Sequence, residues 1–307
     1  MKTTKEMIQG NTIWAGLNKP EIDIEESDVI VFGIPYDGSV SFRSGAKDAP
    51  RALREITYTI APTTEYFESI KDFKVKDIGD VEGENRDELF RKTEEIVKFL
   101  VSKNKFFTMI GGDHSTIIPV MKGIDQGIDE NFGIIHIDAH FDLCDDMDGD
   151  KLSHGSTQRR SLELNHVEDI DSLFFIGIRS IEEDEYEFKQ SNNINVISAS
   201  EYNQLGTDEV IKRVKKKMEK FNKIYITLDI DSLDPAYAAG TGTPQFGGLT
   251  SRELLDLLKG LFDLPIIGFD VVEVAPKLDP ALTSLFAARK IITECWGHQL
   301  RKQDAEL

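Results

Sequence analysis

The sequence contains few cysteines and no long apolar run. Its two cysteines, Cys144 and Cys295, lie far apart, and neither belongs to a CxxC pair. This argues against a disulfide framework and against a metal site built from thiolates, and it predicts a protein of the reducing cytoplasm. The N-terminus, MKTTKEMIQGNTIW, lacks the apolar core of a signal peptide, and no apolar segment approaches the length of a membrane span. We therefore expect a soluble cytoplasmic protein without membrane contact.

Basic residues are also scarce. The chain has 36 lysines and arginines against 55 aspartates and glutamates, a formal net charge of -19. Such a surface would repel nucleic acid and anionic membranes and attract cations, so a small cationic substrate fits its sign. No linker rich in proline, serine or glycine interrupts the chain, which predicts a single domain over residues 1–307 with an N-terminal arm at residues 1–25. Ile13 and Trp14 on this polar arm would pack either on a neighbouring subunit or on the chain's own core.

Short apolar segments rich in β-branched and aromatic residues predict eight strands. They cover residues 28–34, 73–79, 105–111, 132–138, 172–178, 194–198, 223–230 and 265–272. Segments with helical spacing lie between strands at residues 87–101, 207–221 and 250–262, and the last opens with Thr250 and Glu253 in capping-box register. The alternation of strands and helices predicts an α/β fold, with a mostly parallel sheet covered by helices on its faces.

Polar residues of unusual density follow three of these strands. The third strand continues into GGDHS, the fourth into DAHFD and the seventh into DIDSLDP. In a parallel sheet the functional groups collect at the carboxyl edge, so these segments would converge. Within DAHFD and DIDSLDP the candidates stand two residues apart and would share one face of an extended strand. The six candidate ligands are His114, Asp138, His140, Asp142, Asp229 and Asp231.

Electrostatics argue for a metal between these residues. Four carboxylates at a partly buried edge would repel one another and take up protons unless a cation compensated. Four aspartates and two histidines without sulfur suit two manganese or similar divalent ions better than a structural zinc. One ion would be held by His114, Asp138, Asp142 and Asp229, and the other by His140, Asp138, Asp229 and Asp231, so that Asp138 and Asp229 bridge.

Simpler explanations apply to each segment taken alone. A DxD at a strand end is often a loop cap, and GGDHS is compatible with a turn and a helix N-cap. His136 lies deeper in its strand and is expected to be a hydrogen-bonded core histidine rather than a ligand. The acidic run at residues 146–150 resembles the start of a calcium loop, but Thr157 stands where the last acidic ligand would be. We interpret this run as a solvated loop.

Taken together, GGDHS, DAHFD, SHGS, DIDSLDPAYAAGTGTPQFGGLTSRE and GFDVVEVAP resemble the signature set of the ureohydrolase superfamily. FGIPYDGSVSFRSGAKDAPRALRE is similar to agmatinases in particular, and the resemblance covers residues 28–296. It implies an arginase-like three-layer α/β/α sandwich with an eight-stranded parallel sheet, two Mn2+ ions, and hydrolysis of a guanidino group to urea and an amine. The matching positions make the six candidates the metal ligands and add His154 and Glu273 as active-site residues. Agmatinases usually have proline where this chain has Ala239, and this difference would loosen a turn.

The implied chemistry gives these residues distinct tasks. A guanidinium is resonance-stabilised and a poor electrophile, and its amine departs badly unless it is protonated. Two divalent ions would lower the pKa of a water molecule for attack on the guanidino carbon. Glu273 would pair with the substrate's positive NH groups, Asp142 would carry a proton to the departing amine, and His154 would shuttle protons or line the substrate channel. The alternatives are a hydrogen bond within the loop for His154 and a surface salt bridge for Glu273.

The choice of guanidino compound depends mainly on one position. Arginases carry an asparagine two residues after the third metal-binding aspartate to hold the substrate's α-carboxylate, whereas this chain has Cys144 there. This favours agmatine, which would yield putrescine for polyamine biosynthesis. Guanidinobutyrate, guanidinopropionate, guanidine and arginine stay open as alternatives, with Arg159, Arg160 and Arg179 available to pair with a substrate carboxylate.

Two other classes of protein compete with this interpretation. A binding or regulatory protein could keep the fold and the metals without turnover, but it would not require Asp142, His154 and Glu273 together. A mono-zinc deacetylase would carry a tandem histidine pair, and the sequence has no HH dipeptide. The family resemblance also implies a homotrimer or a homohexamer.

Overall fold

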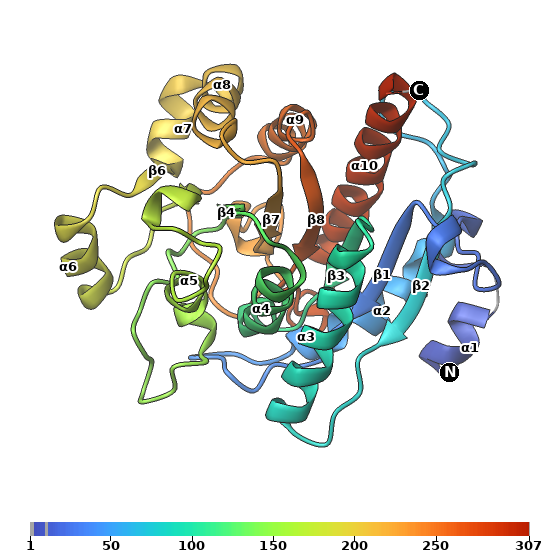
Figure 1. Ribbon diagram of the computed structural model, residues 1–307, viewed down its shortest axis with the longest axis horizontal. Coiled ribbons are helices and arrows are strands. Elements are labelled where there is room, and N and C mark those ends of the chain that lie inside the picture. The colour runs from blue at the N-terminus through green and yellow to red at the C-terminus, as the bar shows by residue number, and fades with distance from the viewer. Residues whose placement is uncertain (1–2, 10–11, 307) are drawn as a thin grey trace.

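The computed structural model describes residues 3–9 and 12–306 and contains one eight-stranded sheet between two layers of helices (Figure 1). The strands are β1 (Val29–Gly33), β2 (Val75–Asp80), β3 (Phe107–Ile110), β4 (Gly133–Ile137), β5 (Leu173–Ile178), β6 (Asn195–Ser198), β7 (Ile224–Leu228) and β8 (Ile266–Val271). The α-helices are α1 (Thr4–Gln9), α2 (Ala49–Ile56), α3 (Arg86–Ser102), α4 (Ile117–Gly127), α5 (Thr157–Ser161), α6 (Glu183–Ser191), α7 (Ala199–Leu205), α8 (Thr207–Met218), α9 (Ser251–Leu261) and α10 (Thr283–Glu306). All eight predicted strands are confirmed, each within two residues at either end.

The last strand of the chain, β8, lies in the middle of the sheet. The order is β2-β1-β3-β8-β7-β4-β5-β6, and every pairing described between these strands is parallel. The carboxyl ends of β3, β8, β7 and β4 are therefore neighbours at one edge. In an open parallel sheet this edge is where ligands bind.

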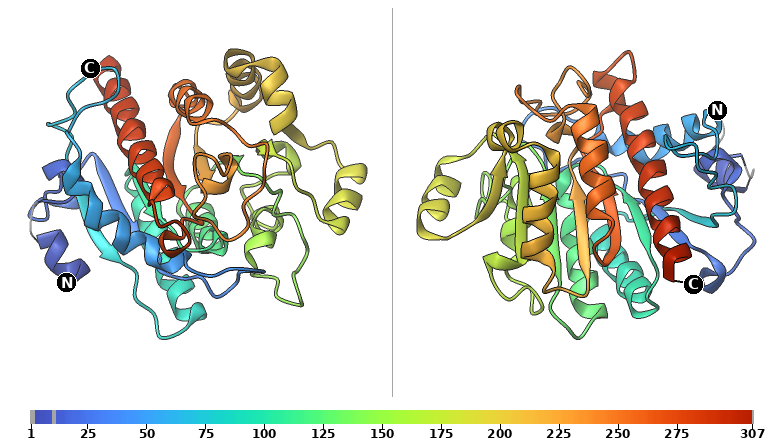
Figure 2. Two further views of the ribbon diagram at one scale, coloured as in Figure 1. Left: turned by 180° about the vertical axis from the view of Figure 1, so that it is seen from behind. Right: turned by 90° about the horizontal axis from the view of Figure 1, so that it is seen from above.

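Two hydrophobic cores lie on opposite faces of the sheet, as the view from above in Figure 2 shows for the helix layers. Helices α2, α8, α9 and α10 contribute to one core, and α3 and α4 contribute to the other. Along β1, Val29 and Val31 belong to the first core, whereas Ile30 and Phe32 belong to the second. Because side chains alternate across a strand, a strand buried on both faces must be apolar throughout, as this one is. The predicted α/β/α sandwich is confirmed.

The three helices predicted from periodicity correspond to α3, α8 and α9. At the start of α9 the Glu253 N–H donates to Thr250 Oγ1 at 3.2 Å, and the Thr250 N–H donates to Glu253 Oε2 at 2.8 Å, so the predicted capping box is formed. Among the described residues, the other seven helices, α1, α2, α4, α5, α6, α7 and α10, were not predicted. No helix in the described part of the chain combines the length and the apolar character needed to cross a membrane.

The N-terminal arm packs on the chain's own core. The Trp14 side chain is fully buried, its ring meets the edge of Trp296 at 5.1 Å between centroids, and its Nε1–H donates to Asp77 Oδ2 at 2.7 Å. Asp77 also forms a two-point ion pair with the buried guanidinium of Arg54, at 2.7 and 2.9 Å. Of the two alternatives for Ile13 and Trp14, packing within the chain is confirmed. Residues 1–2, 10–11 and 307 of the predicted domain lie outside the described residues.

Candidate metal centre and pocket

The six candidate ligands lie together at the carboxyl edge of the sheet. His114 opens the 3-10 helix η5 (His114–Thr116) after β3, residues 138–142 follow β4, and Asp229 and Asp231 follow β7 around the 3-10 helix η8 (Ile230–Ser232). The strand order thus brings three segments from distant parts of the sequence into contact.

The backbone that gathers the aspartates is not the extended strand expected from the sequence. β4 ends at Ile137, and Asp142 has a positive φ of 55°, so alternation across a strand does not set the shared face of Asp138, His140 and Asp142. That part of the prediction was wrong because the chain turns directly after the strand. The turns instead fix the carboxylates: the His140 N–H donates to Asp138 Oδ1 at 2.7 Å, and the Asp231 N–H donates to Asp229 Oδ1 at 2.8 Å.

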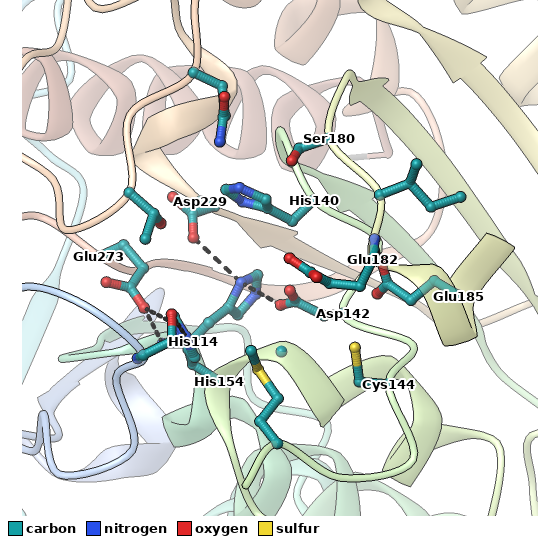
Figure 3. A pocket seen from close by; sticks show the side chains of 16 residues that line it. His114, His140, Asp142, Cys144, His154, Ser180, Glu182, Glu185, Asp229 and Glu273 are labelled. Atoms are coloured by element: carbon teal, nitrogen blue, oxygen red, sulfur yellow. Dashed lines mark hydrogen bonds and ion pairs between the residues drawn. The ribbon is translucent and has the colours of Figure 1, made fainter.

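Two imidazoles each face carboxylates. His114 Nδ1 lies 3.0 Å from Asp138 Oδ2, 3.0 Å from Asp142 Oδ2 and 3.3 Å from Asp229 Oδ2, and Figure 3 shows the last two contacts. His140 Nδ1 lies 3.4 Å from Asp138 Oδ1 and 3.2 Å from Asp231 Oδ2. The two oxygens of Asp138 therefore face different histidines, and this carboxylate lies between two clusters.

His136 is buried beside His114. Its Nε2 lies 3.0 Å from the carbonyl oxygen of His140 and 3.1 Å from Asp138 Oδ2, and its Nδ1 faces the Gln158 amide nitrogen at 3.1 Å. Its ring stacks on that of His114, with centroids 5.2 Å apart and planes inclined by 10°. Both ring nitrogens have protein partners, as expected for a core histidine.

The pKa values of several side chains in the two clusters are shifted because carboxylates lie close together in a buried site. Burial, followed by the charges of Asp231 and Asp138, raises the pKa of Asp229 well above its usual value. Burial disfavours the charged form of His140, but Asp231 and Asp138 outweigh it and raise the pKa of His140 to about 12. Asp138 differs, because burial disfavours its charged form but the neighbouring histidines outweigh burial and hold its pKa well below the usual value. Protons are thus drawn to Asp229 and to His140, which is the response expected of a site that favours cations.

The donor atoms themselves fit a divalent metal. His114 Nδ1, Asp138 Oδ2 and Asp231 Oδ2 are buried and, apart from the histidine–carboxylate contacts given above, have no hydrogen-bond partner among the described residues. Buried polar atoms are normally hydrogen-bonded, and atoms such as these can be satisfied by a cation instead. Imidazole nitrogen and carboxylate oxygen without sulfur suit manganese and similar ions.

Glu273 and His154 form a linked pair beside the clusters (Figure 3). Glu273 Oε1 accepts the His114 N–H at 2.9 Å and lies 3.2 Å from His154 Nδ1. Glu273 follows β8 with a positive φ of 61°, a conformation that a side chain other than glycine adopts at a cost and that is found at functional sites. Burial opposes protonation of His154, but Glu273 raises the pKa of His154 to about 9. The Ser41 N–H, 3.1 Å from His154 Nε2, instead favours the neutral ring.

One glycine permits this packing. Gly112 accepts the Glu273 N–H at 2.8 Å, and a Cβ atom on Gly112 would lie 1.7 Å from the carbonyl oxygen of Tyr36. The loop after β1 therefore passes directly over the backbone that carries His114. This close approach explains why GGDHS opens with glycine.

The clusters open into a pocket with an acidic outer wall. Its lining includes His114, His140, Asp142, Asp229 and Glu273. In Figure 3, Glu182 and Glu185 lie on the side opposite Glu273, and neither lysine nor arginine is among the described lining residues. Burial, followed by the charge of Asp142, raises the pKa of Glu185 to about 7. Sequence reasoning missed this wall, although RSIEEDE follows β5 at the same edge of the sheet and carried the necessary signal.

The three arginines considered for a substrate carboxylate have other partners. Arg179 donates to backbone carbonyl oxygens, among them those of Asp231 at 2.6 Å and Gln245 at 2.8 Å. The Arg160 guanidinium pairs with Asp145 at 3.0 Å, and that of Arg159 lies 4.6 Å from the ring centroid of Phe188. None of the three lines the described pocket.

Two loops near the site are also defined. The segment that lacks the usual proline is held by hydrogen bonds: the Ala275 N–H donates to Gly240 O at 2.7 Å, and the Arg43 guanidinium donates to the carbonyl oxygens of Thr241 and Gly242 at 3.1 and 3.0 Å. In the acidic run at residues 146–150, Asp146 and Asp148 are exposed, in agreement with the predicted solvated loop.

Comparison with known proteins identifies the architecture. The model of the arginase family matches residues 27–297. An agmatinase of Bacillus anthracis is 34% identical over 281 residues, covering 90% of this chain and 93% of that protein. A guanidinobutyrase of Pseudomonas aeruginosa is 32% identical over 276 residues, covering 87% and 85%. The crystal structure of the agmatine ureohydrolase of Thermoplasma volcanium superposes with a TM-score of 0.84 at 29% identity, covering 94% of this chain and 95% of that one. The chain therefore belongs to the arginase family.

Proposed function

We propose that this ureohydrolase cleaves the guanidino group of agmatine to give urea and putrescine, with two Mn2+ ions bound at the carboxyl edge of the sheet. The observation that carries the proposal is the pocket, which joins the carboxylate clusters around His114 and His140 to a wall with further carboxylates. Such a pocket suits a substrate with a positive charge at both ends. The similarity to agmatinases supports the same substrate.

The metals would be held by the six histidine and aspartate side chains that meet at the carboxyl edge of the sheet. His114, Asp138, Asp142 and Asp229 would bind one ion, and His140, Asp138, Asp229 and Asp231 would bind the other. When bound, the ions would offset the carboxylate charge and lower the pKa of a water molecule.

The remaining groups would orient the substrate and move protons. Glu273 Oε1 is engaged by the His114 N–H and by His154, which leaves Oε2 to accept from the guanidinium. Asp142 Oδ2 accepts from the Thr157 hydroxyl at 3.2 Å, and this contact would hold the carboxylate while it carries a proton to the departing amine. His154 would shuttle protons or line the entrance, because it lies between Glu273 and Ser41.

The outer wall supports agmatine over substrates that end in a carboxylate. Glu182, and the ionised form of Glu185, would attract the distal ammonium of agmatine and repel the carboxylate of guanidinobutyrate or guanidinopropionate. Cys144, which stands where arginases carry asparagine, donates through Sγ to Asp184 Oδ1 at 3.4 Å. Its position beside acidic groups gives no partner for the α-carboxylate of arginine.

The proposal is tested by urea release from agmatine, arginine, guanidinobutyrate, guanidinopropionate and guanidine by the manganese-loaded protein. We expect agmatine to give the highest kcat/KM. Because Glu182 is exposed, Glu182→Gln should lower the preference for agmatine over guanidinobutyrate by up to about fivefold, the range of an exposed ion pair. If guanidinobutyrate is preferred, the protein is still a ureohydrolase, but its substrate is guanidinobutyrate rather than agmatine. No urea from any compound, with both ions bound, would favour a binding protein without turnover.

We also propose one ureohydrolase domain that functions in the cytoplasm as a homotrimer or homohexamer. Both cysteines are buried thiols, which suits a reducing compartment. Phe42, Phe67 and Phe246 are 73%, 96% and 87% exposed, and such aromatic surface is typical of subunit interfaces. Light scattering of the purified protein would distinguish a monomer from either assembly.

A further inference from the structure

A row of polar side chains crosses the otherwise apolar core beneath His114. His136 on β4 pairs in register with Thr227 on β7, and Thr227 contacts Asp270 on the adjacent strand β8. All three residues have no exposed surface. Their neighbours on this face are large apolar side chains, including Phe107 and Phe175. Burying polar groups that have no hydrogen-bond partners is costly in free energy, so the partners of these three side chains are of interest.

The contacts form a continuous series of hydrogen bonds that ends on the imidazole of His114. His114 Nε2 lies 2.9 Å from Thr227 Oγ1, and the Thr227 hydroxyl donates to Asp270 Oδ1 at 3.1 Å. The Leu228 N–H donates to the same Asp270 oxygen at 3.1 Å. The carboxylate of Asp270 is thereby held by the backbone of β7 as well as by the Thr227 hydroxyl.

The donor and acceptor in each of these hydrogen bonds follow from the number of protons available. An ionised carboxylate only accepts hydrogen bonds, so the single proton of the Thr227 hydroxyl points to Asp270. The Thr227 oxygen must then accept from Nε2–H of His114. With its proton on Nε2, the ring presents the lone pair of Nδ1 to the oxygens of Asp138, Asp142 and Asp229, the position where the proposed metal would bind.

We propose that Thr227 and Asp270 are positioning residues that fix the ring orientation and the tautomer of His114 and thereby set the affinity of the metal centre. This inference rests on the proposed metal centre but adds two residues that touch neither metal nor substrate. Ligand histidines commonly depend on such outer partners, whose removal weakens metal binding by about tenfold to a hundredfold.

The test compares three substitutions at buried threonines. Thr227→Val keeps the shape and removes the hydroxyl, whereas Thr227→Ser restores it. Thr108→Val is the matched control, because Thr108 is equally buried but its hydroxyl accepts from Trp296 Nε1, at 3.0 Å, rather than from a ligand histidine. Metal affinity is measured by manganese titration against a chelator and by the visible spectrum of the cobalt-loaded protein. Thermal unfolding of the metal-free proteins reports on folding.

We expect Thr227→Val to lower manganese affinity by about tenfold to a hundredfold and to alter the cobalt spectrum, with Thr227→Ser within about threefold of the parent protein. Thr108→Val should keep the parental affinity. Parental affinity and spectrum in a folded Thr227→Val protein would overturn the inference. If Thr227→Val does not fold, Asp270→Asn decides, because a neutral amide accepts a weaker hydrogen bond and should still lower affinity several-fold. These outcomes are separate from failure of the proposed function, which would show as two tightly bound metals without urea release by the parent protein.

Discussion

Replacement of Glu273 by glutamine separates the binding of substrate from the binding of metal. Glutamine keeps the shape and retains an oxygen that can accept the His114 N–H, so the backbone that carries His114 should stay in place. The change removes the negative charge that would face the guanidinium. A charge-assisted hydrogen bond contributes about 1.5–3 kcal/mol, and a guanidinium held through the free Oε2 would lose about that much. Because 1.4 kcal/mol corresponds to a factor of ten, kcat/KM for agmatine should fall by about 10- to 100-fold.

The assay for Glu273→Gln combines urea release with the metal content of the same preparation. Both metals should be retained, because Glu273 is not among the proposed ligands. The matched control is Glu294→Gln, since Glu294 is also a buried carboxylate that accepts a backbone N–H, that of Glu65 at 2.9 Å, but lies outside the described pocket lining. A kcat/KM within about threefold of the parent value would refute pairing with the guanidinium, and loss of a metal ion would make Glu273 a ligand.

Three further substitutions test other parts of the molecule. Asp229→Ala should lose metal ions and urea release together, and retention of both ions by mass spectrometry would contradict its bridging role. Burial and the charge of Arg301 lower the pKa of His298 to about 4, against about 6.5 in an unfolded chain, so the unfolded state binds the proton first and stability falls as the pH decreases. Between pH 7 and pH 5 this costs about 2 kcal/mol, and urea denaturation of His298→Gln should show a pH dependence smaller by that amount. Trp14→Phe leaves Asp77 Oδ2 without the indole N–H and should lower the free energy of unfolding by about 1–3 kcal/mol, whereas an unchanged urea midpoint would show that the arm adds no stability.

The sequence predicts the sheet well because its strands are buried on both faces. Segments such as VIVFG in β1 are apolar without interruption, and the turns around them are marked by charged residues and glycine. Helix α10 escaped prediction because its buried residues, among them Leu285, Ile292 and Trp296, are interspersed with charged residues and give no single clear stripe.

The candidate site is predictable in composition but not in backbone detail. The rule that functional groups collect at the carboxyl edge brings His114 and the aspartates together, and the structure places them within hydrogen-bonding reach of one another. The positive φ of Asp142 cannot be read from alternation, since it depends on the turn that follows β4. The chain through Thr227 to Asp270 depends on the register of β7 against β8, which a single sequence does not specify.

The central position of β8 has a consequence for synthesis of the protein. β2, β1 and β3 lie on one side of this strand, and β7, β4, β5 and β6 lie on the other. Without residues 266–271 the described strands divide into two half-sheets, with His114 following a strand of one and the aspartates following strands of the other. Joining them requires contacts such as that between His114 and Glu273, 159 positions apart, and non-local pairings of this kind form slowly. We therefore expect a chain that ends before β8 to lack the complete centre, so that activity arises only after the last strand joins the two half-sheets.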